Sequence, residues 1–240
     1  MGNTSTPNTL SDLWSIENVQ LKCDTVTIDN TVDNRFTEIL MSGRHLPIHF
    51  TNVATGSQII RDMKTDIHVS RSLTRLKAIF ITLLKTNNAT LSGSQEAERF
   101  WHPMSDNIVN NVPAFKSDLE VEVAVQIGSK TFPIYPIRSL SECFSHLHKT
   151  MGLHFGSGAM NLTRYGYRTS KFIIAIDLEK MTGVGFSGMN TQDGQLLSIK
   201  LGSANKQIPL DNDSNVYTVY YSLVYDGVVN IKMSGVDAYE

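Results

Sequence analysis

The chain has 240 residues, of which 41% are hydrophobic and 18% are charged. This balance supplies a sizeable core and excludes a chain that is disordered throughout. The formal net charge of −2 gives no overall attraction to nucleic acid or to an anionic membrane surface. The length suits one large all-β domain, because β-sandwiches of this size commonly form a single unit.

The N-terminal residues, MGNTSTPNTLSDLW, contain no positive region followed by an apolar one, so they do not predict a secretory signal. The longest apolar runs, such as 172–176, fall far short of the roughly 20 residues that span a bilayer. Without a secretory signal, Cys23 and Cys143 are interpreted as buried free thiols in a reducing compartment. We therefore expect a protein made in the cytoplasm or nucleus and not secreted.

The polar residues 1–13 are predicted to be a flexible arm, and 14–240 a single domain. Apolar and polar residues alternate over 19–28 with one change of phase, which predicts a strand with a bulge. A shorter extended piece is predicted over 45–50. The run 67–84 becomes apolar on both sides in its later part, which predicts a central strand covered on both faces.

Residues 85–117 are rich in asparagine, glycine and proline and predict a long connection, with a helical turn or two at 95–101. Connections of this length are usually functional or interfacial in a compact domain.

The clearest hairpin pattern lies in 118–137, which reads DLEVEVAVQI, GS and KTFPIYPI. Strict two-residue alternation in its first part predicts a strand with one face in a core and one in water. Gly128 and Ser129 supply a two-residue turn before the second strand. The alternating apolar residues are Leu119, Val121, Val123, Val125 and Ile127.

One main helix is predicted over 139–151. Ser139 and Glu142 have the spacing of a capping box, and Gly152 is expected to end the helix. The apolar residues that would share one face are Leu140, Cys143, Phe144, Leu147 and Met151.

Strands are predicted again over 171–178, 195–201, 216–225 and 228–233, with Asp226 and Gly227 as the turn of a second hairpin. No alternation of strands and helices is present, so a doubly wound sheet is not expected. The predicted fold class is all-β: an antiparallel β-sandwich of jelly-roll type, with one main helix and a long inserted connection.

The glycine pattern of a dinucleotide-binding loop occurs at 183–188 as GVGFSG. That chemistry needs a helix that opens directly after the loop, because its N-terminus meets the pyrophosphate. The following residues, MNTQDG, predict a turn into another strand. We interpret the loop as a β-connection and predict no bound cofactor.

No histidine pair has the spacing of a helical metal site. His146 and His148 are two residues apart on the predicted helix and would point in different directions. Pro47 separates His45 from His49. We therefore predict no metal site.

Cys143 and His146 could form a thiolate–imidazole pair on one helical turn, but Cys143 belongs to the apolar face and is interpreted as core. Glu120 and Glu122 are interpreted as a solvated strand face. No catalytic residue is predicted, and the chain is not expected to be an enzyme.

Arg71, Arg75 and Lys77 would fall on one side of an extended strand. They could make a weak, salt-sensitive phosphate contact or face solvent or another subunit. Gly2 fits a short myristoylation pattern, and whether it is modified stays open.

Six blocks in this order resemble a known family: WSIENVQLKCDTVTID, SRSLTRLKAIFITLLK, FPIYPIRSLSECF, SKFIIAIDLEKM, GFSGMNTQDGQLLSIKL and YYSLVYDGVVNIKMSGVDAYE. Together they resemble the second jelly roll of the double-jelly-roll major capsid proteins of Polinton-like viruses and related eukaryotic DNA viruses and transposons. The resemblance covers most of the chain from Trp14 onward. The family carries two fused rolls and forms trimers, whereas this length allows one roll with decorated loops. The chain would then be a fragment, one half of a split capsomer or a single-roll relative.

The resemblance implies a structural protein that assembles with copies of itself, as a trimer or a larger shell, and possible contact with other capsid subunits. It implies a place in the virion, with weak or no nucleic-acid contact. Candidate interface residues are Trp101, Tyr217, Tyr221 and Tyr225. Trp101 could instead plug the open end of the sandwich, and the three tyrosines, on one side of their strand, fit a core equally well.

Two alternatives share the architecture. A β-sandwich binding module for a carbohydrate or a protein would need an exposed aromatic platform, which Tyr217, Tyr221 and Tyr225 could form. A cupin-like enzyme would need clustered metal ligands, which the sequence does not show.

Overall fold

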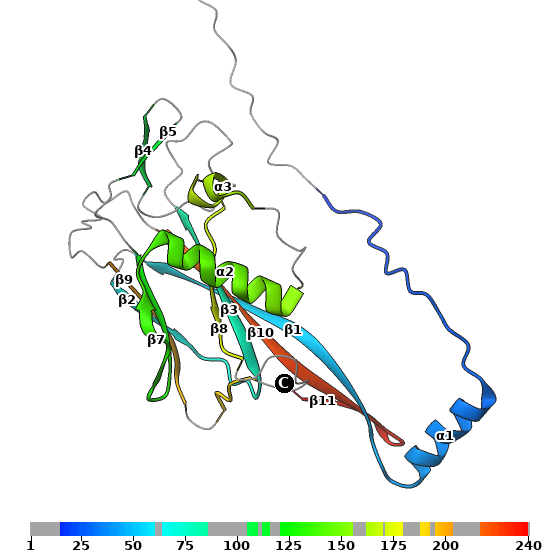
Figure 1. Ribbon diagram of the computed structural model, residues 1–240. Helices are drawn as coiled ribbons and strands as arrows, with labels where there is room; N and C mark the ends of the chain where they lie inside the picture. The colour runs from blue at the N-terminus through cyan, green and yellow to red at the C-terminus, as the bar shows by residue number, and fades with distance from the viewer. Residues whose placement is uncertain are drawn as a thin grey trace, which may run out of the picture.

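The computed structural model describes residues 15–60, 64–85, 105–109, 112–115, 121–155, 162–169, 171–179, 188–192, 195–203 and 217–239. Within these ranges, two antiparallel sheets enclose one hydrophobic core, and a long helix lies along one side of them (Figure 1). A strand ribbon and a shorter helix project from this body toward one end.

The strands are β1 (Leu46–Ile60), β2 (Thr65–Val69), β3 (Leu76–Lys85), β4 (Ser105–Val109), β5 (Val112–Phe115), β6 (Val121–Ile127), β7 (Lys130–Ile137), β8 (Ile174–Asp177), β9 (Leu197–Ser203), β10 (Tyr217–Lys232) and β11 (Gly235–Tyr239). The helices are α1 (Asn30–Met41), α2 (Leu140–Phe155) and α3 (Arg164–Thr169).

The strand order is β1-β10-β3-β8 in one sheet, with β11 added on β10, and β2-β9-β6-β7 in the other. The antiparallel pairs are nested: β1 pairs with β10, β2 with β9, β3 with β8, and β6 with β7. A chain of nested pairs rolled into two packed sheets is a jelly roll. This topology confirms the predicted fold class. The pair β4 and β5, within the predicted long connection, forms a separate small sheet.

Alternation in the sequence correctly predicted the central hairpin. Val121, Val123, Val125 and Ile127 of β6 are buried, and the residues between them, apart from Ala124, are half-exposed. Gly128 turns the chain into β7 with a φ of +57°, which the first position of a type II′ turn requires.

The prediction of a central strand over 67–84 is confirmed in its later part, although one face is buried and most residues of the other, such as Phe80 and Thr82, are half-buried. β3 lies between β10 and β8, and Ile79, Ile81 and Leu83 are fully buried. The earlier part belongs to β2 in the other sheet. Between them Leu73 is buried, and its backbone N–H donates to Thr191 Oγ1 at 2.8 Å.

Helix α2 begins where the capping box predicted and ends later. The Glu142 backbone N–H donates to Ser139 Oγ at 3.1 Å, and Glu142 Oε2 accepts from the Arg138 N–H at 3.0 Å. The predicted end at Gly152 is wrong, because the helix continues to Phe155. Glycine lowers helix propensity but leaves the backbone N–H in place, so further turns can continue through it.

Replacing Gly152 with alanine is therefore expected to raise the free energy of unfolding by about 0.5–1 kcal/mol. A Cβ at this position would meet nothing within 4 Å, so no clash offsets the gain. Urea denaturation followed by circular dichroism checks the result. Lower stability in the variant would contradict a helix that continues through residue 152.

The second predicted hairpin is wrong. Asp226 and Gly227 make no turn; β10 runs through them for 16 residues and turns only before β11. Gly227 lies opposite Phe50 of β1, and a Cβ at Gly227 would lie 2.6 Å from Phe50 Cζ. The glycine is therefore needed for a close cross-strand approach within a strand.

The predicted strand over 19–28 is not formed in this chain. Residues 15–29 are exposed and belong to no sheet, and the unpredicted helix α1 follows them. The extended piece predicted at 45–50 is the beginning of the much longer β1. The predicted arm 1–13 and the helical turn at 95–101 lie outside the described residues.

Candidate assembly surface

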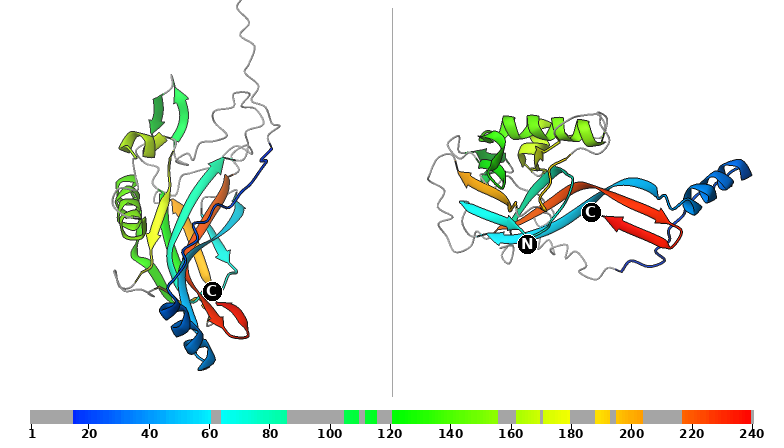
Figure 2. Two further views of the ribbon diagram at one scale, coloured as in Figure 1. Left: turned by 90° about the vertical axis from the view of Figure 1, so that its right-hand side faces the viewer. Right: turned by 90° about the horizontal axis from the view of Figure 1, so that it is seen from below.

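Strand β10 changes partner along its length. Residues 217–225 pair with β3 inside the jelly roll, whereas 228–232 pair with β11. Together with 46–53 of β1, residues 226–232 of β10 and β11 form a three-stranded projection, which we call the ribbon. Figure 2 shows the ribbon and α1 leaving the body of the sandwich in both views.

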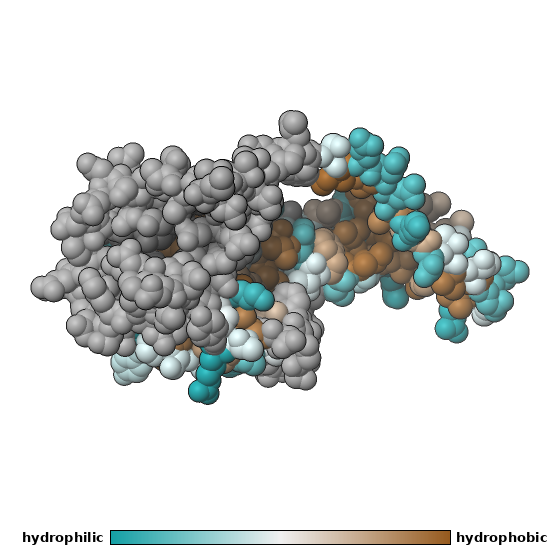
Figure 3. All heavy atoms as spheres, turned by 90° about the horizontal axis from the view of Figure 1, so that it is seen from above, coloured by the Kyte–Doolittle hydropathy of each residue, from teal (hydrophilic) through white to brown (hydrophobic). Residues whose placement is uncertain are grey.

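The ribbon exposes apolar side chains, as do α1 and the extended segment before it. Figure 3 shows hydrophobic surface between the sandwich and the outer end of the ribbon. Exposed apolar surface of this extent on a folded domain marks an interaction site. Its large apolar residues are Ile16, Val19, Leu21, Val26 and Ile28 in the segment, Val32, Phe36 and Met41 in α1, and Ile48, Val53, Met233, Val236 and Tyr239 in or beside the ribbon.

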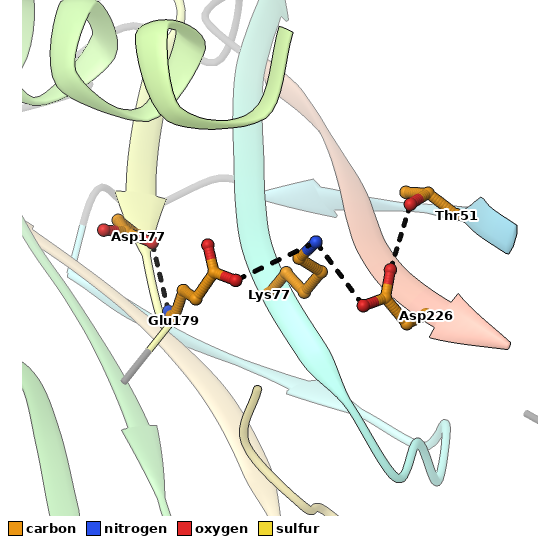
Figure 4. A network of polar contacts seen from close by, with 5 residues as sticks. All are labelled: Thr51, Lys77, Asp177, Glu179 and Asp226. Atoms are coloured by element: carbon orange, nitrogen blue, oxygen red, sulfur yellow. Dashed lines mark hydrogen bonds and ion pairs between the residues drawn. The ribbon is translucent and has the colours of Figure 1, made fainter. Parts of the chain in front are cut away.

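Charged side chains tie the base of the ribbon to the sandwich (Figure 4). Lys77 Nζ lies 3.4 Å from Asp226 Oδ2 and 3.9 Å from Glu179 Oε1. Thr51 Oγ1 donates to Asp226 Oδ1 at 2.9 Å, and the Glu179 backbone N–H donates to Asp177 Oδ1 at 3.0 Å. Lys77 is the extra residue of a β-bulge, because Leu76 and Ala78 pair with consecutive residues of β10. The bulge thus directs a lysine between two largely buried carboxylates.

Two glycine–aromatic pairs stiffen the β1–β10 ladder. Gly227 faces Phe50, and Gly56 faces Tyr221, whose ring occupies the space that a Cβ would fill. An aromatic ring over a cross-strand glycine covers backbone that would otherwise be solvated. At the tip, Lys232 and Asp237 form an ion pair across the β10–β11 hairpin, and hydrogen bonding to Lys232 lowers the pKa of Asp237.

The predicted interface residues do not gather on the ribbon. Trp101 lies outside the described residues. Tyr217 begins β10 and pairs with Ile60 and Lys85, but its side chain is outside the described part. Tyr221 is half-buried against the core, and Tyr225 is 1% exposed, its hydroxyl accepting from Asn52 Nδ2 at 3.0 Å.

The core alternative is therefore favoured for Tyr225, and an interface role for the four residues stays a proposal. Sequence reasoning missed the ribbon itself. The available signal was the apolar alternation on both sides of Asp226 and Gly227, which fits one long strand as well as two short ones.

The residues considered for chemistry have the following positions in the described part of the chain. The described residues contain no cluster of three or more metal-ligating side chains. Of the glycine loop, only Gly188 is described; it leads into a bridge between Met189 and Leu76. Lys77 takes part in the ionic contacts at the ribbon base, and the Arg71 guanidinium lies 5.9 Å from the Tyr225 ring centre. Gly2 is outside the described residues.

The interpretation of Cys143 as a core residue agrees with its position, whereas the prediction that Cys23 is buried is wrong. Cys143 is 1% exposed, and burial, with a smaller effect of Glu142, raises its pKa to about 12. Cys23 is an exposed thiol within the extended segment, because that segment packs against no sheet.

At pH 8 we expect iodoacetamide to label one cysteine per native chain, because Cys143 is protonated and shielded while Cys23 is accessible. Mass spectrometry of the intact protein should show a second label only in denaturant. Rapid double labelling of the native chain would contradict the buried position of Cys143.

A pocket of about 210 Å³ lies between α2 and α3 and is lined by Leu140, Ser141, Phe144, Arg164 and Tyr167. Small-molecule sites typically occupy roughly 300–1,000 Å³, so this pocket is small for a ligand site. Tyr167 is 1% exposed and donates from its hydroxyl to the Ile173 carbonyl at 2.9 Å. Its ring therefore belongs to the packing that fixes α3 near β8.

No family model matches the sequence, and no curated protein matches it. Solved structures do. The Faustovirus major capsid protein is similar over 84% of this chain, with a TM-score of 0.55 and 12% identity. This similarity supports the jelly-roll fold. The chain spans only 36% of the length of that protein.

Two further similar structures come from PBCV-1. A quasi-atomic model of the PBCV-1 virus capsid has a TM-score of 0.48 and 8% identity, and covers 89% of this chain and 55% of that one. PBCV-1 VP54, fitted into a reconstruction of the virophage Sputnik, has a TM-score of 0.46 and 9% identity over the same shares. In the described part of the chain, no helix has the length and hydrophobicity needed to cross a membrane.

Proposed function

We propose that this chain is a non-enzymatic structural subunit that assembles with copies of itself into the shell of a virion. The ribbon carries the proposal, because it places apolar side chains in water on a projection that the jelly roll does not need for its own core. The fold similarity to the Faustovirus major capsid protein supports the same role. Within this proposal, the chain is related to the second jelly roll of the capsid proteins of Polinton-like viruses.

The physical argument rests on burial. Covering one large apolar side chain contributes about 1.5–3 kcal/mol, and a stable interface buries about 1,200–2,000 Å² in total. Exposed residues such as Ile48, Met233 and Val236 lie on one projection held by β1 and β10. A rigid sandwich with such a projection can dock on a neighbour without rearranging its own core.

The partners that we propose are other copies of the chain, as a trimer or a larger assembly, and other capsid subunits. The chain spans 36% of the length of the Faustovirus protein, so the arrangement of a whole capsomer is not carried over to it. Nucleic-acid contact is proposed to be weak or absent, because the net charge is −2.

Negative-stain electron microscopy of the purified full chain at rising concentration tests the proposal. We expect trimers, rings or particles. A uniform monomer at high concentration would contradict self-assembly and favour a binding module, for which glycan-array binding would be the next measurement.

A further inference from the structure

Residues 19–28 have the pattern of a strand but no partner strand. Apolar residues alternate along VQLKCDTVTI with one change of phase, which is typical of a strand with a bulge. In the structure Val19, Leu21 and Val26 are 82%, 90% and 83% exposed. Leaving several large apolar side chains in water is unfavourable, so this segment is expected to be covered in the assembled protein.

The outer edge of β1 is suited to receive such a strand. β1 is the first strand of its sheet, has 15 residues, and pairs only with β10 among the described strands. Proteins normally protect long edges with charged residues or proline, because an exposed edge can pair with another chain. Residues 50–60, FTNVATGSQII, contain neither a charged residue nor a proline.

The other edges are protected or short. β7 contains Pro133 and Pro136, each of which lacks a backbone N–H. β2 and β11 have five residues each, and each contains an aspartate. β8 has four residues and packs beside α2. Among the edge strands of the two main sheets that the structure describes, the long unprotected edge is therefore that of β1.

Segment and edge match in length and charge. An extended strand rises about 3.3 Å per residue, so 19–28 would cover nearly all of 50–60. Lys22 and Asp24 balance each other, and the edge carries no charge to repel them. Helix α1 lies at the outer end of the ribbon, with none of its residues buried. Figure 1 shows the segment before it running clear of the chain's own β1.

We propose that residues 19–28 add as a strand to the outer edge of β1 in a second copy of this chain. The inference rests on the proposed self-assembly and names the contact that holds neighbours together. Backbone hydrogen bonds along 50–60 give the affinity, and Val19, Leu21 and Val26 cover apolar surface beside the edge. A reciprocal exchange between two copies would produce a symmetric contact.

Proline substitution tests the backbone pairing while the apolar side chains stay in place. Lys22→Pro and Thr25→Pro are combined because the backbone N–H groups of successive residues in a strand point to opposite sides. One position is even and the other odd, so at least one proline removes an N–H that would bond to β1. Light scattering of the full chain is expected to show association weakened at least tenfold. The control, Ser15→Pro with Glu17→Pro, lies outside 19–28 and should associate like the unmodified chain.

Cross-linking distinguishes the partner. One chain keeps Cys23, and a second, differently tagged chain carries Cys23→Ser with a new cysteine on the edge: Asn52→Cys, Thr55→Cys or Gln58→Cys. All three positions are exposed, and a disulfide forms only where the Cβ atoms approach to about 3.5–4.5 Å. Mild oxidation of the mixture is expected to give a disulfide between unlike chains for at least one position.

Three results would contradict the inference, and they are distinguishable. A third chain, which keeps Cys23 and also carries the edge cysteine, tests pairing within one chain: a disulfide in it, with none between the two unlike chains, would place the segment on its own β1. Assembly that tolerates both prolines and gives no cross-link would overturn the strand addition and leave the proposed function intact. A monomeric unmodified chain would overturn both.

Discussion

Replacing Lys77 with methionine is expected to lower the free energy of unfolding by roughly 2–4 kcal/mol. Lys77 Nζ is the cation between Asp226 and Glu179, whose side chains are only 10% and 7% exposed. Removing one member of a buried ion pair typically costs about 3–5 kcal/mol, because the remaining charge has no partner. The lysine itself is 18% exposed, so water moderates the loss.

Urea denaturation measures this loss of stability. Two further variants test whether the loss comes from the buried ion pairs of Lys77. Lys149→Met removes another lysine near a carboxylate, 3.9 Å from Asp177 but 65% exposed, and should change stability by less than about 0.5 kcal/mol. Adding Asp226→Asn to Lys77→Met should recover part of the loss, since it removes one of the two carboxylates that lose their contact with the lysine. Equal losses in the Lys77 and Lys149 variants would contradict the buried network.

Placing charge on the ribbon is expected to weaken self-association by about a hundredfold or more. The variant combines Ile48→Glu with Val236→Glu, at side chains that are 50% and 64% exposed. Covering the exposed part of each side chain contributes about 1–2 kcal/mol, and burying an unpaired carboxylate in its place costs several kcal/mol more. The loss therefore exceeds the roughly 2.8 kcal/mol that corresponds to a hundredfold change. Light scattering across a dilution series measures the association.

The monomer should fold as before, because both side chains already face water in the isolated chain. Ile134→Glu is the matched control: it places the same charge at an 83% exposed residue of β7, outside the ribbon, and should assemble normally. Unchanged assembly of the ribbon variant, or equal loss in the control, would contradict the assignment of the ribbon as the assembly surface.

Sequence patterns correctly predicted those parts of the fold that depend on residues close together in the chain. The turn at Gly128 and the Ser139–Glu142 cap depend on residues within a few positions, so the sequence predicts them directly. The alternation in β6 states which face is buried, and that prediction holds.

The errors arise where a distant residue decides the outcome. Asp226 and Gly227 have a turn pattern, but Lys77 pairs with the aspartate and Phe50 fills the space over the glycine. Both partners are far away in the sequence, so the local pattern favours a turn that the fold does not make. The ribbon follows from this continuous strand and could not be predicted without knowing its register.

For the candidate site, the sequence predicted which residues share one side of a strand but not what that side contacts. Periodicity placed Tyr221 and Tyr225 on one side of their strand, and both contact the core. The pattern cannot tell a core from an interface, because both bury apolar surface. Likewise, the alternation in 19–28 indicates a strand but does not name its partner strand.

Sedimentation velocity of the unmodified full chain over a wide concentration range tests self-assembly most directly. We expect the mean mass to rise with concentration to at least three times the 26.7 kDa of one chain. A mass that stays at that of one chain up to the highest soluble concentration would contradict the shell-forming role.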